Sequence, residues 1–267
     1  MEKLLDNEFE WGGISFFYSN GGKVRERRIH TRYEMTRLLG GEVVFMSEKH
    51  RLPLKKDTLL LIPKDTYHTF DYKRIDDFER TVIFFDTDGV LAPIATRLTD
   101  IMVIEEPERI SKKLLDELVE ILKTSRPDRE QMLSAYSLFL SVLIRETSKK
   151  CMKYAPERTS VVSYAVDYIN DNLSSRLDIE LLSGLLHMSE SAFAHLFKRE
   201  LGMTPHKYIE EKRLYLAKRL IAEGEKPSKI YSECGWSDYS SFYKAFRKMF
   251  GYSPSDSVNG IEKNFDI

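Results

Sequence analysis

A sequence pattern that occurs twice near the C-terminus constrains the fold more than any other feature of the chain. The first copy begins at Met188-Ser189-Glu190, and the second begins at Trp236-Ser237-Asp238. In each copy a serine and an acid are followed by Phe-x-x-x-Phe, a basic pair and Gly-x-(Thr/Ser)-Pro. The second copy has one extra residue between the serine and the first phenylalanine. A repeat of this kind predicts two copies of one helical unit.

Each part of the pattern has a physical reason. Ser189 and Ser237 are predicted to cap a helix by accepting a backbone N–H bond, and the acids that follow suit the positive end of the helix dipole. Phenylalanines four residues apart lie on one helix face, which predicts that they are buried together. The glycine is expected to end the helix in the left-handed conformation, and the proline to start the next one.

A short helix and a turn are predicted before each copy, Ile179–Leu186 with His187 and Ile230–Cys234 with Gly235. A short helix, a tight turn and a capped second helix make a helix-turn-helix, here Leu177–Leu201 and Ser228–Phe250. The alternative is two helical hairpins that only pack as a bundle. Paired phenylalanines alone would fit that alternative, but the repetition of the whole pattern favours DNA binding.

Helical patterns cover nearly all of the chain after Ser160, with further helices predicted over Val161–Asn170 and Pro205–Ala222. The second of these joins the two units and would be about 27 Å long at the standard rise. It could therefore hold the two recognition helices near the roughly 34 Å that separates successive major-groove windows on one face of DNA.

The region from Ser160 to Ser257 resembles the C-terminal domain of the AraC/XylS transcription regulators. The match is most specific in the second unit, with Gly235-Trp236-Ser237-Asp238 and Phe242-x-x-x-Phe246-Arg247-Lys248. The resemblance implies two helix-turn-helix units that bind asymmetric sites on double-stranded DNA, and it implies RNA polymerase as a partner.

Base contacts are expected on the exposed face early in the second helix of each unit. The candidates are Ser191, Ala194 and His195 in the first unit and Tyr239, Ser240, Tyr243 and Lys244 in the second. Histidine and lysine can donate to guanine, whereas alanine and tyrosine suit thymine methyls or sugar edges. The second face is chemically richer, so the second unit is expected to carry more of the sequence readout.

Phosphate contacts are expected from residues at the ends of these helices and on the long helix. The candidates are Ser189, Lys198, Arg199, Arg213, Ser237, Arg247 and Lys248. The chain has a net charge of -1, but Ser189–Gly251 contains twelve Lys/Arg and eight Asp/Glu, a local positive excess. For each basic residue, a solvated surface charge remains an equal alternative.

The first hundred or so residues contain short segments that are rich in Val, Ile, Phe and Thr and bounded by turn signals. Strands are predicted over Ile14–Tyr18, Glu42–Met46, Thr58–Ile62 and Thr81–Phe85, which favours a sandwich or barrel. Their order, with Gly40-Gly41, Pro63 and His68 between them, resembles a small cupin barrel, over about Ile14–Phe85. Such a barrel often serves AraC-type regulators as an effector sensor.

An effector site is predicted at His30, Arg32, Glu34 and His68. Arg32 occupies the position of the second histidine in the His-x-His pair of metal-binding cupins, and arginine does not ligate metals. We therefore expect an organic effector, such as a sugar or organic acid, and no metal or cofactor. Two alternatives remain open, a metal held by the two histidines and the carboxylate, and an Arg32–Glu34 pair that senses nothing.

Two amphipathic helices are predicted between residues 107 and 150, the second beginning at Asp128. They have more apolar surface than a connector needs, so a homodimer is expected, with mere covering of the barrel as the alternative. Residues 151–159, or more broadly Lys149–Thr159, are predicted to be a linker between this part and the helical domain at 160–257.

The sequence therefore predicts an α+β multidomain protein, with a cupin-like β-barrel over residues 1–106, a helical pair and an all-α domain with two helix-turn-helix motifs. We expect a cytoplasmic, effector-responsive transcription regulator rather than an enzyme. The N-terminus has no signal-peptide pattern, no segment reads as a membrane span, and Cys151 and Cys234 match no metal or redox spacing. The alternative is a metal-dependent cupin enzyme fused to a DNA-binding domain.

Overall fold

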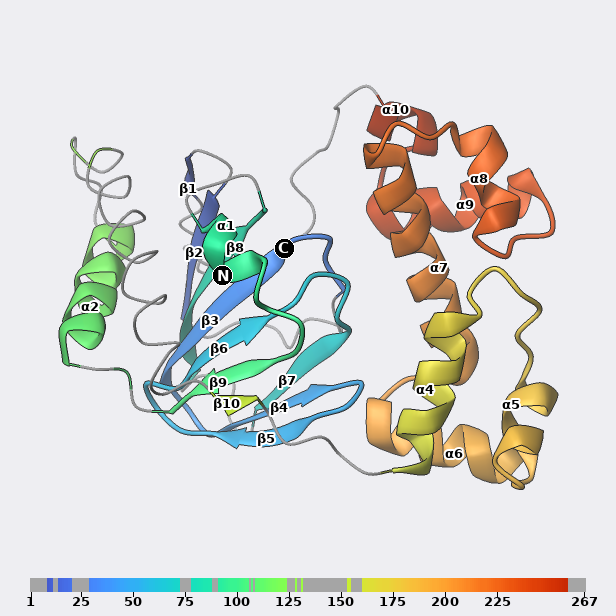
Figure 1. The fold of residues 1–267 in the computed structure, drawn as a ribbon, viewed down its shortest axis with the longest axis horizontal. Helices are drawn as coiled ribbons and strands as arrows, with labels where there is room; N and C mark the ends of the chain where they lie inside the picture. The colour runs from blue at the N-terminus through green and yellow to red at the C-terminus, as the bar shows by residue number, and fades with distance from the viewer. Residues whose placement is uncertain are drawn as a thin grey trace, which may run out of the picture. The chain divides into compact units, whose positions relative to one another are not determined.

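A computed structural model describes residues 9–11, 14–20, 29–72, 78–87, 91–105, 107, 109–123, 128, 131, 153–154 and 160–258. The chain divides into two compact units, with residues 1–28 and 32–157 in the first and residues 29–31 and 158–267 in the second. The first unit is rich in strands and the second is helical (Figure 1). The expected combination of a sheet-rich N-terminal part and a helical C-terminal part is confirmed.

The described strands of the first unit form two antiparallel sheets. The larger, seven-stranded sheet has the order β1 (Phe9–Trp11), β2 (Ile14–Asn20), β8 (Glu79–Phe85), β3 (Tyr33–Gly40), β6 (Leu59–Ile62), β9 (Met102–Ile104) and β10 (Lys153–Tyr154). The smaller sheet has the order β5 (Arg51–Leu54), β4 (Val43–Ser47) and β7 (His68–Tyr72).

These strands differ from the predicted barrel, because the described part of the chain has two separate sheets and no closed ring of strands. All four predicted strands are present as β2, β4, β6 and β8, each with ends shifted by at most two residues. Strand β3, which contains the predicted site residue Glu34, lies between β8 and β6 in the larger sheet. Strands β1, β5, β7, β9 and β10 were not predicted.

The larger sheet has a hydrophobic core on each of its faces. Successive side chains along a strand point to opposite sides, so neighbouring residues belong to different cores. On β6, Leu59 and Leu61 belong to the core that includes α2 (Arg109–Lys123) and α1 (Ala92–Ala95). Leu60 and Ile62, which point the other way, belong to the core shared with Phe45 of the smaller sheet. This explains why β6 reads as a continuous apolar run rather than as an alternating one.

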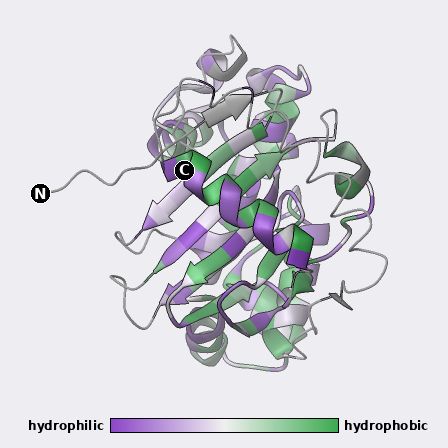
Figure 2. Cartoon of the chain, turned by 90° about the vertical axis from the view of Figure 1, so that its left-hand side faces the viewer, coloured by the Kyte–Doolittle hydropathy of each residue, from purple (hydrophilic) through white to green (hydrophobic). Residues whose placement is uncertain are grey.

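Helix α2 packs its apolar side on the larger sheet. In Figure 2 the helix lies in front of this sheet. Leu115, Leu118 and Leu122 are buried in the same core as β2 and β8. The helix therefore covers the sheet, which was the alternative to dimerisation, and the homodimer stays a prediction. Of the second predicted helix, only Asp128 and Gln131 fall within the described residues.

The predicted linker differs from the structure at two residues. Lys153 and Tyr154 form β10 and pair with Val103 and Met102 of β9, so part of this segment belongs to the larger sheet. The rest of residues 149–159 lies outside the described residues.

The second unit consists of helices whose bounds, where they were predicted, lie within two residues of the prediction, except that the short helix before Gly235 begins at Pro227 instead of Ile230. They are α4 (Val161–Asp171), α5 (Ile179–Leu185), α6 (Glu190–Leu201), α7 (Pro205–Ala222), α8 (Pro227–Glu233), α9 (Tyr239–Phe250) and α10 (Pro254–Val258). Gly202 and Gly251 end α6 and α9 with φ angles of 73° and 79°, which confirms the predicted left-handed caps. No helix in the described ranges combines the length and apolarity that crossing a membrane requires.

Candidate DNA-reading helices and a buried polar cluster

Helices α5 and α6 form one helix pair, and α8 and α9 form a second pair of the same kind. Phe193 and Phe197 on α6, like Phe242 and Phe246 on α9, have no exposed surface. Their rings meet edge to face at centroid distances of 5.6 Å and 5.7 Å. The predicted burial of both phenylalanine pairs is confirmed, and it leaves the opposite face of each helix for solvent or a partner.

The two helices are capped by different residue types. The hydroxyl oxygen of Ser189 accepts the N–H of Ala192 at 3.3 Å, as predicted. In the second pair the cap is Asp238, whose carboxylate accepts the N–H of Ser241 at 2.8 Å, and the prediction that Ser237 caps the helix is wrong. That backbone bond also lowers the pKa of Asp238 below its ordinary value.

The cap geometry explains the extra residue in the second copy. Asp238 lies four residues before Phe242, as Ser189 lies four residues before Phe193, so the additional residue is Ser237 and it precedes the helix. An insertion outside the helix leaves the rotation of α9 about its axis unchanged relative to its buried phenylalanines.

Aligned on their caps, the predicted base contacts fall into corresponding pairs. Ser191 corresponds to Ser240, Ala194 to Tyr243, and His195 to Lys244. Ser191, His195, Ser240 and Lys244 are exposed, whereas Ala194 and Tyr243 are partly buried. Tyr239 is also partly buried, and its ring packs on Tyr231 and Phe242, each at a centroid distance of 5.8 Å.

The predicted phosphate contacts fall into two groups. Lys198 and Arg199 lie in the last turn of α6 and Arg247 and Lys248 in the last turn of α9, and all four are exposed, as are Ser189 and Ser237. Arg213 on α7 differs, because its guanidinium is engaged inside the domain. Its Nε donates to the carbonyl of Leu173 at 2.9 Å, and its Nη2 donates to the carbonyl of Ser175 at 2.6 Å.

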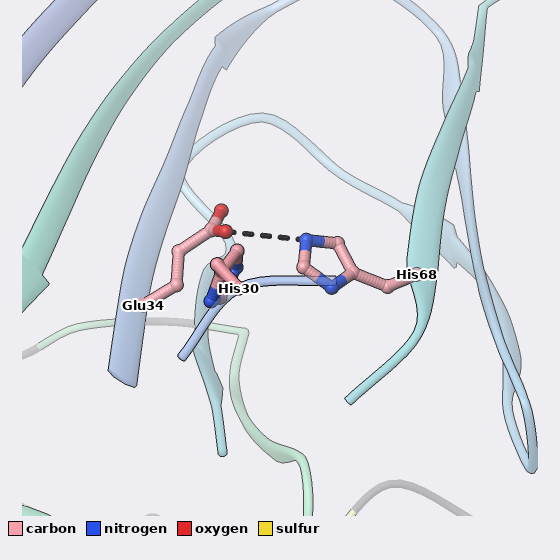
Figure 3. Close-up of side chains that lie close together, drawn as sticks. All are labelled: His30, Glu34 and His68. Carbon is pink, nitrogen blue, oxygen red and sulfur yellow. Dashed lines mark hydrogen bonds and ion pairs between the residues drawn. The ribbon is translucent and has the colours of Figure 1, made fainter. Parts of the chain in front are cut away.

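Three buried polar side chains at and near the start of β3 and β7 form a cluster (Figure 3). His30 precedes β3, Glu34 is on β3 and His68 is the first residue of β7, and their exposed fractions are 5%, 2% and 3%. One ligating atom from each residue lies within 4.8 Å of the others. The sheets thus bring together three of the four residues predicted to bind an effector.

Hydrogen bonds fix the orientation of His68. Its Nδ1 lies 3.0 Å from the carbonyl oxygen of Thr66, and because a carbonyl only accepts, Nδ1 carries the hydrogen. Its Nε2 lies 3.2 Å from Oε2 of Glu34, whose other oxygen accepts the hydroxyl of Thr36. The ring of Phe45 stacks on the imidazole at 5.9 Å.

This arrangement directs the lone pair of a neutral His68 at a carboxylate oxygen. Two lone pairs repel, so a proton or a cation between Nε2 and Glu34 is needed to make the contact favourable. Two imidazoles and one carboxylate form a donor set that suits a transition metal, and a histidine whose other nitrogen donates to a carbonyl is a typical metal ligand. The cluster therefore has the residues to hold either a proton-sharing network or a divalent ion.

The guanidinium of Arg32 forms hydrogen bonds with residues that are not members of this cluster. Its Nε donates to Asp86 at 2.9 Å, its Nη1 to the hydroxyl of Ser15 at 2.6 Å and its Nη2 to the carbonyl of Phe84 at 3.1 Å. These groups lie on β2 and at the end of β8, so the guanidinium connects the residue before β3 to both of these strands. Arg32 forms an ion pair with Asp86 at 2.9 Å, whereas the alternative that senses nothing pairs it with Glu34.

Comparison with known proteins bears on the helical unit. Residues 182–259 match a family model described as a helix-turn-helix domain. The probable transcriptional regulator LumQ of Photobacterium leiognathi is 36% identical over 143 residues, which are 52% of this chain and 57% of that protein. The arabinose operon regulatory protein of Salmonella typhimurium is 30% identical over 136 residues, 50% of this chain and 48% of that protein.

The C-terminal domain is an AraC-type helix-turn-helix domain. The resemblance inferred from the repeated pattern is confirmed for this domain. The chain spans about half the length of the curated relatives it matches. A crystal structure of ToxT from Vibrio cholerae O395 aligns with 92% of this chain and 97% of its own at 13% identity and a TM-score of 0.41, too distant a likeness to bear on function.

Some residues of the AraC-type domain and of the cluster were not singled out by the sequence analysis. Asp238 was assigned to the helix dipole rather than to the cap, although aspartate is as good a cap as serine. Thr36 could have been found from strand alternation, because it lies two residues after Glu34 and so on the same face. Phe45 comes from the other sheet, and no local signal connects it to His68.

Proposed function

We propose that the chain is a sequence-specific DNA-binding transcription regulator with two helix-turn-helix motifs, the α5–α6 pair and the α8–α9 pair. The observation that carries this proposal is the matching set of exposed polar residues on α6 and α9, opposite their buried phenylalanines. The AraC-type domain and the regulators named among the relatives support it. We place the protein with its DNA in the cytoplasm, and we expect it to act with RNA polymerase.

In this proposal α6 and α9 enter the major groove. His195 and Lys244 occupy the same position on the two helices and point donors at base edges. Ser191 and Ser240 add hydroxyls, and the exposed basic residues in the last turns contact phosphates. Because Lys244 carries a full positive charge and Tyr243 a ring where the first helix has His195 and Ala194, α9 carries more of the specificity.

The test begins with duplexes selected from a random library by the wild-type chain. Lys244→Ala should lower affinity for the selected duplex by about tenfold to a hundredfold, the value of one good base contact, and change affinity for random duplexes little. Lys64→Ala, an exposed lysine of the first unit, is the matched control. An equal loss on both kinds of duplex would reassign Lys244 to a phosphate, and a library that yields no preferred sequence would contradict the proposal.

We further propose that the first unit, a cupin-like sensor, binds a small effector at His30, Glu34 and His68. Two histidines and a carboxylate, buried among aromatic rings, can bind hydroxyls or a carboxylic acid. The donor set favours a divalent metal as the second candidate ligand. A bound metal would supply Lewis acidity, and it would fit either a metal-responsive regulator or a metal-dependent enzyme fused to the AraC-type domain.

Calorimetric titration separates the two ligand classes. Zn²⁺ and Mn²⁺ are titrated separately from a panel of sugars and organic acids. The variants His68→Ala and Glu34→Gln should bind a ligand of this cluster at least about tenfold more weakly than the wild type. Each substitution removes a hydrogen-bonding or metal-ligating partner of the bound ligand. Arg32→Ala is the control, since its guanidinium lies outside the cluster. Binding that survives all three substitutions would place the ligand elsewhere.

A further inference from the structure

The two helix pairs of the AraC-type domain are joined by more than α7. The connection between α4 and α5 reaches the turn between α8 and α9 (Figure 1). A Cβ atom added at Gly235 in that turn would lie 2.4 Å from the carbonyl oxygen of Leu173 in the connection. The first half of the domain therefore touches the second pair at the turn that sets the angle between α8 and α9.

Arg213 holds both sides of this contact. It projects from α7, donates to the carbonyls of Leu173 and Ser175, and lies so close to Gly235 that an added Cβ would be 2.6 Å from its Cζ and its Nε. The planar guanidinium can reach two carbonyls at once because its N–H groups form a rigid fork. One side chain thus connects the middle of the joining helix, the α4–α5 connection and the second turn.

The first helix pair shows that backbone conformation alone does not require glycine in this turn. His187 occupies the corresponding position between α5 and α6 with a φ of 53°, and it is exposed. Gly235 has a φ of 77°, but here a side chain would also collide with Leu173 and Arg213. The missing Cβ at position 235 therefore makes room for the arginine and the carbonyl.

We infer that Arg213, Gly235 and the carbonyls of Leu173 and Ser175 form a clasp that fixes the second helix pair relative to the first, so that α6 and α9 engage DNA together. This inference rests on the proposed function for its DNA consequence. It makes Arg213 a positioning residue for two-site recognition, in place of the phosphate contact expected from the sequence. Linked binding modules gain affinity only when their geometry allows simultaneous contact.

The DNA test compares the selected duplex with duplexes in which the bases read by one pair are randomised. Arg213→Ala and Arg213→Lys should both lower affinity for the complete duplex by about a hundredfold, the low end of the gain from linkage, and leave affinity for the half-randomised duplexes unchanged. Lysine keeps the charge but loses the fork. Retained affinity in Arg213→Lys, or equal losses on all duplexes with a salt dependence reduced by about one ion, would show a phosphate contact and overturn the clasp.

A structural test separates failure of the clasp from failure of the DNA-binding proposal. Spin labels are placed at Ser191→Cys and Ser240→Cys in the full chain, with Cys151→Ser. Cys234 stays unlabelled because it is buried, which raises its pKa to about 12. The distance distribution without DNA should be narrow and should broaden in Arg213→Lys and Gly235→Ala. Gly224→Ala, at a φ of 97° with no described atom within 4 Å of the added Cβ, is the control for backbone strain and should leave the width unchanged. An unchanged width in Arg213→Lys and Gly235→Ala would overturn the clasp whatever the chain does on DNA.

Discussion

At the scale of single residues, α6 and α9 keep the same rotation about their axes, relative to their buried phenylalanines, although the turns before them differ in length. The extra residue of the second copy lies before the cap, so the buried phenylalanines and the exposed residues keep the same spacing in both helices. The cap type changes from serine to aspartate, and both residues accept one of the N–H groups that a helix start leaves unpaired. Ser237 is thereby free of a capping role.

Substitutions at the caps test this assignment. Asp238→Ala should lower the melting temperature of the second unit by roughly 2–5 °C, because an unpaired N–H is left at the start of α9. Ser189→Ala should have a similar effect through α6. Ser237→Ala, one residue away and exposed, should leave the melting temperature unchanged. Thermal unfolding followed by circular dichroism measures all three, and a larger effect of Ser237→Ala than of Asp238→Ala would restore the serine as the cap.

At the scale of elements, the helices of the AraC-type domain were predictable because their signals are local. The left-handed Gly202 and Gly251 end α6 and α9, Pro205 and Pro254 start the helices that follow, and the phenylalanine spacing marks the buried face. These signals act within one or two turns of the chain. They do not specify contacts between helices, which is why the sequence assigned Arg213 to phosphate and gave no indication of Leu173 as its partner.

The sheets were less predictable because strand partners are distant in sequence. β3 lies between β8 and β6, and Glu34 is level with Phe84 on one side and Ile62 on the other. Strand propensity indicated where strands lie but not this order. His30, Glu34 and His68 could be predicted to lie together because the order of the segments resembles that of a cupin barrel. The hydrogen bonds of Arg32 to Ser15 and Asp86 could not be predicted, because these partners are distant in sequence.

Helix α2 shows how a polar contact can decide the use of an amphipathic element. Arg37 on β3 is 1% exposed and donates to Asp57 at 2.7 Å and to Asp116 on α2 at 2.6 Å. Lys112 of α2 also pairs with Asp57, at 2.7 Å. Removing the partners of a buried guanidinium strongly destabilises the fold, because the charge is left buried and unpaired. These pairs therefore hold α2 on the sheet, where its apolar side packs in the core of the same chain.

At the scale of the whole molecule, each unit has its own core. The first unit buries residues from both sheets and α2, and the second buries the phenylalanines of α9 against α7. A unit with its own core can unfold by itself, so two thermal transitions are expected. A substitution that acts inside one unit should move one transition and leave the other in place, which makes the second transition an internal control.

Asp57→Asn provides that test and gives it a pH dependence. Asp57 has a φ of 70°, which asparagine also tolerates, so the substitution removes mainly the charge. Burial raises the pKa of Asp57, but hydrogen bonds from Lys112 and Arg37 outweigh burial and hold it below the ordinary value of 3.8. A carboxyl whose folded pKa is depressed contributes stability above its unfolded pKa and loses it as pH falls through the folded pKa.

At pH 7, Asp57→Asn should therefore destabilise the first unit by about 2 kcal/mol, the value of hydrogen bonds to a charged group. The difference from wild type should shrink as the pH is lowered from 3.8 towards the folded pKa. Differential scanning calorimetry at pH values from neutral to acid measures both transitions, with the exposed Asp71→Asn as the matched control. A constant difference at all pH values would remove the Asp57 charge from the stability of the sheet and α2, and a shift of both transitions together would contradict independent units.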